Sequence, residues 1–387
     1  MGSLGENYSN SHSNGDDHGY PRKPLKQSGL LNEKFESDDL TPAIGREFPK
    51  VNIVDDLLNS PDADTLLRDL AITISERGVV FFRAQTNLTD ALQKVFIQRM
   101  GELTNKPTTS TLHIHPVLNG TSEFGHDNEI STISSVTRKK LFGVYGEVKN
   151  PRRYDAAQWH SDIQFEKCPA DYTSLRLTQL PKNGGDTLWA SGYEVYDRFS
   201  KTYQKFLEGL TATFIGDGFI KAEQAGRTTL YDQPRGSPQN VGKALTAVHP
   251  VVRTNPVTGW KSVFAIGSFP KVINELNAEE SDELLAKFRR MVIENHDLQV
   301  RFKWRNEHDI GTFERISSHS YRDEERETDA DYTIGEIAIW DNRSAFHCAT
   351  FDYDGLGERF GNRAVGIGEA PYLDPNSQSR TEALAAA

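Results

Sequence analysis

Between about residue 140 and residue 270, the chain consists mainly of short apolar segments separated by turns rich in glycine, proline and asparagine. YTSLRLTQL and DTLWA are two of these segments, and the later LQVRFKW and GEIAIWD have the same character. Short runs bounded by turn residues are typical of β-strands. Because many short strands must bury one face against another layer, the pattern favours a β-architecture of the jelly-roll type.

Helical periodicity surrounds this region of strands. SPDADTLLRDLAITISERG has apolar residues at helical spacing, with Ser60 as a cap, Pro61 in the first turn and Gly78 at the end. A buried strand, VVFFRA, follows it, and LTDALQKVFIQRMGEL and AEESDELLAKFRRMVIENH are two further helices. We therefore expect an α+β, mainly β fold with a double-stranded β-helix (jelly-roll) core and flanking helices.

Composition divides the chain into one domain with two tails. Residues 1–44 are rich in Ser, Asn, Gly and Asp, which predicts a disordered N-terminal tail. Residues 45–375 form the expected domain, and residues 376–387 form a C-terminal tail. Within the domain, the acidic segment 306–333 is longer than an ordinary strand connection, and predicts either an active-site lid or a disordered loop.

The charge balance limits the classes of partner. A formal net charge of −11 argues against nucleic acid and anionic membranes, because both select clustered positive charge. No apolar run approaches the length of a transmembrane span, and the N-terminus has no signal-peptide core. The two cysteines suggest no disulfide framework. These features predict a cytoplasmic protein with a small-molecule partner, and they leave the oligomeric state open, a homo-oligomer included.

A metal site is suggested by two separate motifs. AAQWHSD places His160 and Asp162 two residues apart, although a single His-x-Asp arises by chance too often to decide anything. Much later, IWDNRSAFH runs from an apolar strand through a turn to His347. Two histidines and one carboxylate form the facial triad that holds non-haem Fe(II) and leaves coordination positions open. We predict that the chain folds back to bring these three residues together.

Two arginines follow the second motif. Arg359 lies twelve residues after His347, and Arg363 lies four residues further. An arginine on the next strand is suited to clamp a dicarboxylate cosubstrate through two hydrogen bonds. Because a spacing of four residues turns both side chains to the same face of a strand, the second arginine would meet another anion nearby.

In the content and order of these motifs, the chain resembles the taurine/2-oxoglutarate dioxygenase (TauD/TfdA) family of non-haem Fe(II) oxygenases. The matching stretches are LHIHPV, WHSD, GGDTLWAS, HPVVRTNPVTG, IAIWDNRSAFH and GERFGNRAV, and the C-terminal part is similar to fungal members. The resemblance implies a dioxygenase that contains Fe(II), uses 2-oxoglutarate and O₂ as cosubstrates, and releases succinate and CO₂.

The resemblance also implies roles for individual residues. It assigns Thr187 and Arg359 to the distal carboxylate of 2-oxoglutarate. It places His115 and Arg363 at the positions that hold the sulfonate in the taurine enzyme, and Phe269 on an aromatic wall of that pocket. His115, Arg363 and Phe269 would therefore form a pocket that recognises a small anionic substrate.

Three positions put parts of this assignment in question. Leu118 stands where the taurine enzyme has a tyrosine, and Ala156 replaces an asparagine near the amine of taurine. These changes argue against taurine itself and leave the anion site intact. His113 is an imidazole as available to the substrate as His115.

The sequence is compatible with three alternative functions. The first is hydroxylation of a small organic anion, such as a sulfonate or a sulfate ester. The second is the same chemistry on a purine of the xanthine type or on a secondary metabolite. The third is a non-enzymatic jelly-roll binding protein. Arg363 favours the first, because a neutral heterocycle needs no second cation, and the intact triad disfavours the third.

Overall fold

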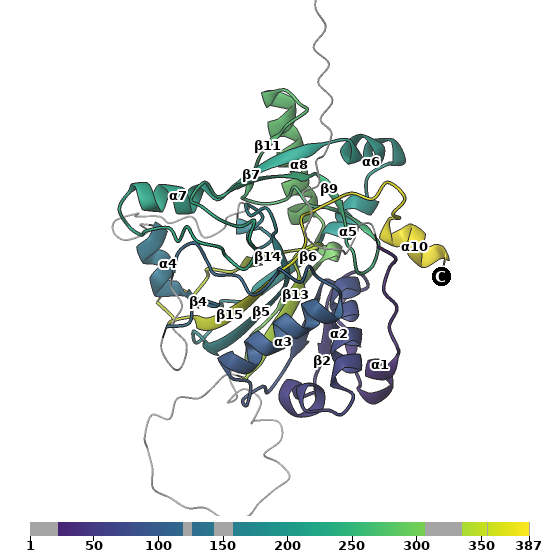
Figure 1. Cartoon of the computed structure of the whole chain (residues 1–387), viewed down its shortest axis with the longest axis vertical. Coiled ribbons are helices and arrows are strands. Elements are labelled where there is room, and N and C mark those ends of the chain that lie inside the picture. Colours follow the sequence, from purple (N-terminus) through teal and green to yellow (C-terminus); the bar gives the residue numbers. More distant parts are fainter. Residues whose placement is uncertain (1–21, 119–125, 143–157, 306–334, 354, 387) are drawn as a thin grey trace, which may run out of the picture.

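The computed structural model describes residues 22–118, 126–142, 158–305, 335–353 and 355–386 (Figure 1). Residues 1–21 of the expected N-terminal tail, Ala156 and the acidic segment 306–333 lie outside these ranges.

A seven-stranded mixed sheet forms the larger wall of the molecule, in the order β1-β2-β3-β13-β5-β15-β4. Its strands are β1 (Asp38–Asp39), β2 (Arg46–Phe48), β3 (Val79–Phe82), β4 (Ile130–Ser134), β5 (Ala170–Gln179), β13 (Glu336–Asp341) and β15 (Phe360–Ile367). β2 and β3 are parallel, and the other neighbours are antiparallel. The late strands β13 and β15 thus lie on either side of β5.

A three-stranded antiparallel sheet packs against this wall. It contains β6 (Thr187–Ser191), β12 (Gln299–Phe302) and β14 (Ala345–Ala349), with β6 in the centre. A layer of buried aromatic rings joins the two sheets. Trp189 of β6 meets Phe81 of β3 edge-on, with ring centroids 5.3 Å apart, and lies 5.7 Å from Trp340 of β13. The two sheets are therefore held together by large apolar contacts.

Helices cover the other face of the seven-stranded sheet (Figure 1). They are α1 (Leu30–Lys34), the π-helix η1 (Ile53–Leu58), α2 (Ala63–Arg77) and α3 (Asp90–Leu103). The expected strand VVFFRA and the two helices around it are confirmed. α2 has its N-cap at Asp62 rather than Ser60, whose hydroxyl accepts a bond from the Asp62 N–H at 3.2 Å. Gly78 ends the helix with a φ of 74°, a backbone angle that glycine adopts without strain.

The region in which mainly short strands were expected also contains three helices. They are α5 (Gly192–Asp197), α6 (Lys201–Glu208) and α7 (Asp217–Gln224). Ser191 and Ser200 cap the first two, since each hydroxyl accepts a backbone N–H of the first turn. The expectation was wrong here because these helices are too short to show a clear helical period.

The remaining elements complete the outer part of the fold. They are β7 (Thr211–Ile215), β8 (Thr246–Pro250) and β11 (Pro270–Ile273), which form one sheet, the pair β9 (Val252–Thr254) and β10 (Lys261–Val263), and α4 (Ser135–Phe142), α8 (Ala278–Glu294), η3 (His296–Leu298) and α10 (Arg380–Ala386). α8 confirms the third predicted helix and begins with a capping box between Asn277 and Glu280. No helix in the described ranges is both long and apolar enough to cross a membrane.

The described part of the N-terminal segment is packed against the domain, which corrects the expected tail at 1–44. Leu31 of α1 is 1% exposed and belongs to the core beneath α2. Asp69 of α2 accepts hydrogen bonds from the backbone and hydroxyl of Ser28 and from the backbone of Gly29. The polar composition of residues 22–44 was misleading, because a few buried contacts hold the segment in place.

The C-terminal residues also form contacts, where a tail was expected from residue 376. The backbone N–H of Lys261 donates to the carbonyl of Gln378 at 2.9 Å. In α10, Arg380 forms an ion pair with Glu194 of α5 at 2.8 Å. This end of the chain is therefore part of the folded domain.

Replacing Leu31 by alanine should lower the free energy of unfolding by roughly 2–5 kcal/mol, the usual effect of emptying a buried leucine site. Leu40 is 38% exposed in the same segment, so Leu40→Ala should cost less than about 0.5 kcal/mol. Urea unfolding of both variants measures the difference. Equal stability of the two variants would show that the segment does not belong to the cooperative core.

Candidate metal centre and its two cavities

His160, Asp162 and His347 meet at one point, as predicted. Their ligand atoms all lie within 4.8 Å of one another. His347 lies on β14, and its backbone pairs with that of His160 through two hydrogen bonds of 2.8 and 3.1 Å. This antiparallel bridge brings together two motifs that are far apart in the sequence. The Nε2 atom of each imidazole lies 3.9 Å from Oδ1 of Asp162.

Asn342, in the turn between β13 and β14, fixes the position of Asp162. Its side-chain oxygen accepts the backbone N–H of Asp162 at 3.0 Å, and its carbonyl accepts the Ser161 hydroxyl at 2.7 Å. Its amide donates to the Thr173 hydroxyl at 2.8 Å and to the carbonyl of Asp171 at 3.1 Å. The turn therefore holds the segment that carries His160 and Asp162, two of the three candidate metal ligands.

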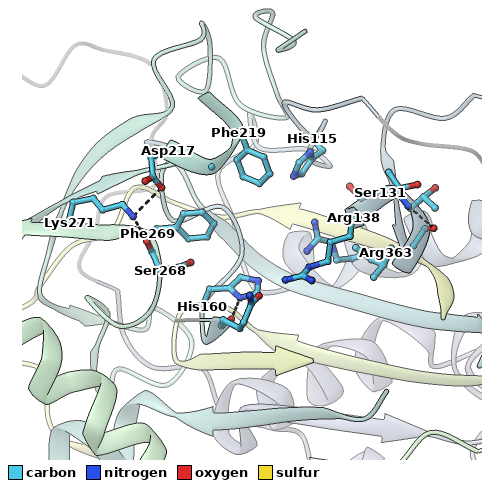
Figure 2. Close-up of a pocket in the computed structure, with 16 residues that line it drawn as sticks. His115, Ser131, Arg138, His160, Asp217, Phe219, Ser268, Phe269, Lys271 and Arg363 are labelled. Atoms are coloured by element: carbon cyan, nitrogen blue, oxygen red, sulfur yellow. Dashed lines mark hydrogen bonds and ion pairs between the residues drawn. The ribbon is translucent and has the colours of Figure 1, made fainter. Parts of the chain in front are cut away.

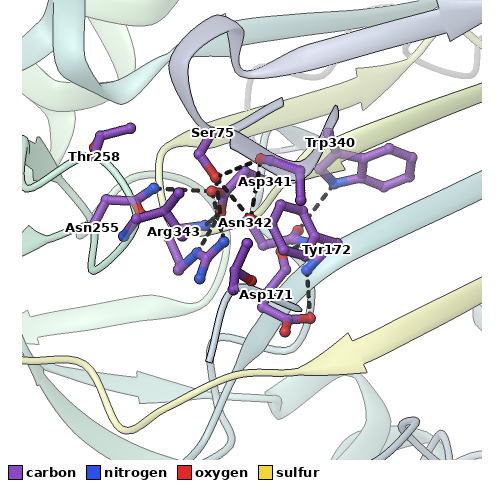
Figure 3. Close-up of polar contacts among 12 residues, drawn as sticks. Ser75, Asp171, Tyr172, Asn255, Thr258, Trp340, Asp341, Asn342 and Arg343 are labelled. Atoms are coloured by element: carbon purple, nitrogen blue, oxygen red, sulfur yellow. Dashed lines mark hydrogen bonds and ion pairs between the residues drawn. The ribbon is translucent and has the colours of Figure 1, made fainter. Parts of the chain in front are cut away.

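A buried ion pair supports this turn (Figure 3). Asp341 accepts two hydrogen bonds from the guanidinium of Arg343, at 2.7 and 2.9 Å, and one from Asn255 at 2.9 Å. Burial opposes ionisation of Asp341, but the charge of Arg343 outweighs it and holds the pKa of the carboxyl below its usual value. The Arg343 guanidinium also lies over the ring of Tyr172, 4.7 Å from its centroid. The charged side chains of Asp341 and Arg343 therefore hold the turn on either side of Asn342.

The three side chains have the protonation states that a divalent metal requires. Burial lowers the pKa of His160, and it lowers the pKa of His347 to about 3. Nδ1 of His160 lies 2.6 Å from the carbonyl of Gln158, so it carries the proton and leaves Nε2 as a donor to metal. Burial opposes ionisation of Asp162, but the charge of Arg363 lowers its pKa overall. Two neutral imidazoles and one carboxylate are a donor set that suits Fe(II).

A small cavity of about 160 Å³ opens beside His347. Arg359 and Thr187, the two residues that the resemblance assigned to the cosubstrate, both line it, and the Arg359 Nη2 donates to the Thr187 hydroxyl at 3.1 Å. Arg359 is 4% exposed, and no carboxylate in the described ranges lies within 4 Å of its guanidinium. Burial lowers its pKa to about 10, which leaves it charged at neutral pH. A buried cation of this kind suits an anionic ligand.

A larger cavity of about 580 Å³ lies on the other side of His160 (Figure 2). His115, Arg363 and Phe269, the three residues that the resemblance assigned to the substrate, line it. The ring of Phe269 lies edge-on to that of His160, with centroids 6.0 Å apart. The two cavities share six lining residues: Ile133, Ser134, Arg138, Gln158, His160 and Arg363. A molecule in either cavity would therefore lie beside the metal centre.

Two predicted substrate residues have protein partners as well. Arg363 forms an ion pair with Oδ1 of Asp162 at 2.5 Å. Nδ1 of His115 contacts the backbone N–H and carbonyl of Val117, and burial lowers the pKa of this histidine to about 3. His113 is 1% exposed and does not line the described part of the larger cavity, so His115 is the imidazole at that surface.

Several site residues were not found from the sequence. Arg138 on α4 and Gln158 line both cavities, and Trp304 donates to Thr187. Gln158 stands two residues before His160, inside the AAQWHSD motif, so that motif could have pointed to it. Nothing in the sequence around Arg138 or Trp304 indicated a role. Leu118 is 46% exposed and is absent from the described lining of the larger cavity.

Comparison with known proteins identifies the family. The model of the taurine catabolism dioxygenase TauD, TfdA family matches residues 36–314. The chain belongs to the TauD/TfdA family. A putative alpha-ketoglutarate-dependent taurine dioxygenase from Burkholderia xenovorans has a similar crystal structure, with a TM-score of 0.60 and 24% identity over 89% of this chain and 92% of that one. The TauD/TfdA fold is therefore shared.

Fungal relatives of this TauD/TfdA protein cover most of its length. The alpha-ketoglutarate-dependent dioxygenase oryG of Aspergillus oryzae is 46% identical and covers 95% of this chain and 97% of its own. The dioxygenase btcD of Neocamarosporium betae is 47% identical, with 94% and 98% covered. A putative alpha-ketoglutarate-dependent sulfonate dioxygenase of Schizosaccharomyces pombe is 31% identical, with 83% and 68% covered.

These findings establish the class of reaction. The protein is a 2-oxoglutarate-dependent dioxygenase that uses Fe(II) and O₂, and its His-Asp-His group supplies the matching donor set. The third function considered from the sequence, a non-enzymatic binding protein, is thereby excluded.

Removing a metal ligand should abolish turnover. We expect His347→Ala to weaken Fe(II) binding by more than about 100-fold, because two remaining ligands hold the ion poorly. His296 is exposed and does not belong to this group of ligands, so His296→Ala is the matched control. Anaerobic titration with Fe(II) measures the affinity. Unchanged iron binding in His347→Ala would remove this residue from the metal centre.

Removing the buried cation of the smaller cavity should affect the cosubstrate alone. We expect Arg359→Leu to weaken 2-oxoglutarate binding by roughly 10- to 150-fold, the value of a hydrogen bond to a charged group. Fe(II) binding should change little. Calorimetric titration of the anaerobic Fe(II) enzyme measures this affinity, with the exposed Arg290→Leu as control. If 2-oxoglutarate binds Arg359→Leu as tightly as the wild type, its distal carboxylate lies elsewhere.

Proposed function

We propose that this dioxygenase oxidises an organic anion, a sulfonate or a sulfate ester, whose charged head lies between Arg363 and Arg138. The observation that best supports the proposal is that two cavities meet at His160. The smaller one has the size and the buried cation that suit 2-oxoglutarate, and the larger one leaves room for a substrate beside the same metal.

In this proposal, His160, Asp162 and His347 hold Fe(II), and Arg359 and Thr187 bind the distal carboxylate of 2-oxoglutarate. The bound iron and cosubstrate supply the oxidising chemistry: one oxygen atom of O₂ enters a substrate C–H bond, the other enters succinate, and CO₂ leaves. The residues of the chain orient the reactants and exclude water. A sulfonate that is hydroxylated at the carbon bearing sulfur breaks down to sulfite and an aldehyde.

Two guanidinium groups support an anionic substrate. Arg363 already shares its charge with Asp162, but its Nε atom is buried and has no hydrogen-bond partner in the described ranges. Arg138 adds a second positive charge where the cavities meet, and its guanidinium lies 3.9 Å from the centroid of the Phe351 ring. Figure 2 shows the Arg138 side chain extending toward His160 from the side of Arg363. A sulfate or sulfonate group offers the oxygen acceptors that such a pair requires.

Aromatic rings support an apolar body for this substrate. Phe219 and Phe269 line the middle of the larger cavity, and Lys271 and Asp217 form a 3.1 Å ion pair at its other end (Figure 2). The similarity to a putative sulfonate dioxygenase of Schizosaccharomyces pombe agrees with an anionic head. An alkyl or aryl chain between the two charged ends would bury its apolar surface against the rings.

A secondary metabolite is a second candidate substrate. A cavity of about 580 Å³ falls in the range typical of sites for drug-sized ligands, and is larger than a two-carbon sulfonate needs. The same iron chemistry would then act on a larger and less charged molecule.

We also propose that the seven-stranded and three-stranded sheets are the two walls of a double-stranded β-helix, or jelly roll. The aromatic layer between them supports this arrangement, and the metal ligands would lie at one open end.

A substrate panel separates the two candidates. Alkyl sulfates and sulfonates of increasing length should drive succinate formation, whereas the matched neutral alcohols should not, since they carry no anionic oxygens for the guanidinium groups of the cavity. Arg363→Leu should lower kcat/KM for the anions by roughly 10- to 150-fold, with 2-oxoglutarate affinity nearly unchanged. Iron binding is measured in the same variant because Arg363 contacts Asp162. Equal turnover of neutral and anionic substrates would reject the anion and favour the second candidate.

A further inference from the structure

Trp304 lies two residues after the end of β12, behind the wall of the smaller cavity. Its indole Nε1 donates a hydrogen bond to the Thr187 hydroxyl at 3.1 Å, and the residue is 5% exposed. Thr187 lines that cavity, while Trp304 does not belong to its described lining. The hydrogen bond to Thr187 therefore links the tryptophan to the proposed cosubstrate site.

The hydroxyl of Thr187 is left with one possible role toward a ligand. A threonine hydroxyl has two lone pairs and a single proton. Nη2 of Arg359 and Nε1 of Trp304 each donate to this oxygen, both at 3.1 Å, and together they occupy its lone pairs. No acceptor in the described part of the chain takes its proton. The O–H is therefore available to an acceptor in the cavity.

Trp304 is itself held firmly. Its ring lies edge-on to that of Phe302, with centroids 4.9 Å apart, and Phe302 stacks on Phe81 at 4.1 Å. The next residue, Arg305, donates its backbone N–H to the buried carboxylate of Glu336 at 2.7 Å. These contacts, to the residues on either side of Trp304 in the chain, restrict the orientation of its indole ring.

We propose that Trp304 is a positioning residue for 2-oxoglutarate. By occupying one lone pair of the Thr187 oxygen, while Arg359 occupies the other, it turns the Thr187 proton toward the distal carboxylate. This inference rests on the proposed assignment of Thr187 and Arg359 to that carboxylate. It adds that the site discriminates between 2-oxo acids through a fixed hydroxyl proton as well as through the charge of Arg359.

Binding of two 2-oxo acids to the anaerobic Fe(II) enzyme tests the inference. 2-Oxoglutarate carries the distal carboxylate, and 2-oxopentanoate has the same carbon chain without it. We expect Trp304→Phe to weaken 2-oxoglutarate binding by about 3- to 10-fold, the range of one neutral hydrogen bond, and to change 2-oxopentanoate binding less than about twofold. Trp260→Phe, at a residue away from both cavities, should change neither affinity.

A double-mutant cycle supplies the decisive comparison. In a Thr187→Val background, Trp304→Phe should have no further effect on 2-oxoglutarate, because the hydroxyl through which it acts is gone. An additive loss, or an equal loss for both 2-oxo acids, would overturn the inference and leave Trp304 as a packing residue.

A conservative variant keeps the test valid if Trp304→Phe does not fold. Trp304→His retains a ring N–H donor and should lose less 2-oxoglutarate affinity than Thr187→Val does, whereas an equal loss would contradict the inference. Failure of the proposed function gives a different result. In that case, Thr187→Val and Arg359→Leu would both bind 2-oxoglutarate like the wild type, and the inference about Trp304 would fall with it.

Discussion

The two backbone hydrogen bonds between His160 and His347 are the contact on which the rest of the site depends. They join the segment before β5 to strand β14 of the three-stranded sheet β12-β6-β14. Once these backbones are paired, Asp162 lies two residues from one ligand and within reach of the other. A metal centre with three ligands thus needs only one long-range backbone contact, and side chains have to refine it.

Asn342 makes that refinement, and buried charge holds it in place. Its side chain uses both its oxygen and its nitrogen to bind the Asp162 segment and β5. The neighbours of Asn342, Asp341 and Arg343, form an ion pair that water does not reach. Losing one partner of such a pair leaves an uncompensated buried charge, so the turn resists deformation. A rigid turn is what a metal site needs, because small displacements of a ligand weaken binding.

Arg363 connects the metal to the larger cavity. Its guanidinium pairs with Asp162 on one side and lines the cavity on the other. An anion in that cavity would compete with Asp162 for the same positive charge, and a metal ion would draw Asp162 away from it. If the substrate is an anion, as proposed, it and the metal ion would both interact with the Arg363–Asp162 pair, and their binding would be electrostatically linked. The shared lining of the two cavities places this link next to His160.

The sequence by itself determined the family, the three residues of the His-Asp-His group and the arginine that lines the smaller cavity, because these residues stand in compact motifs. It also predicted α2, α3 and α8, whose apolar periods are long enough to be recognised. The packing of residues 22–44 against α2, and the short helices α5 to α7, were decided by contacts that leave little local pattern. Only the tertiary structure brought Arg138 and Trp304 to the site, since their roles depend on which strands and helices meet there. Sequence motifs contain the candidate metal ligands and cavity arginines. The side chains around them come from distant parts of the chain and can be identified only in the folded structure.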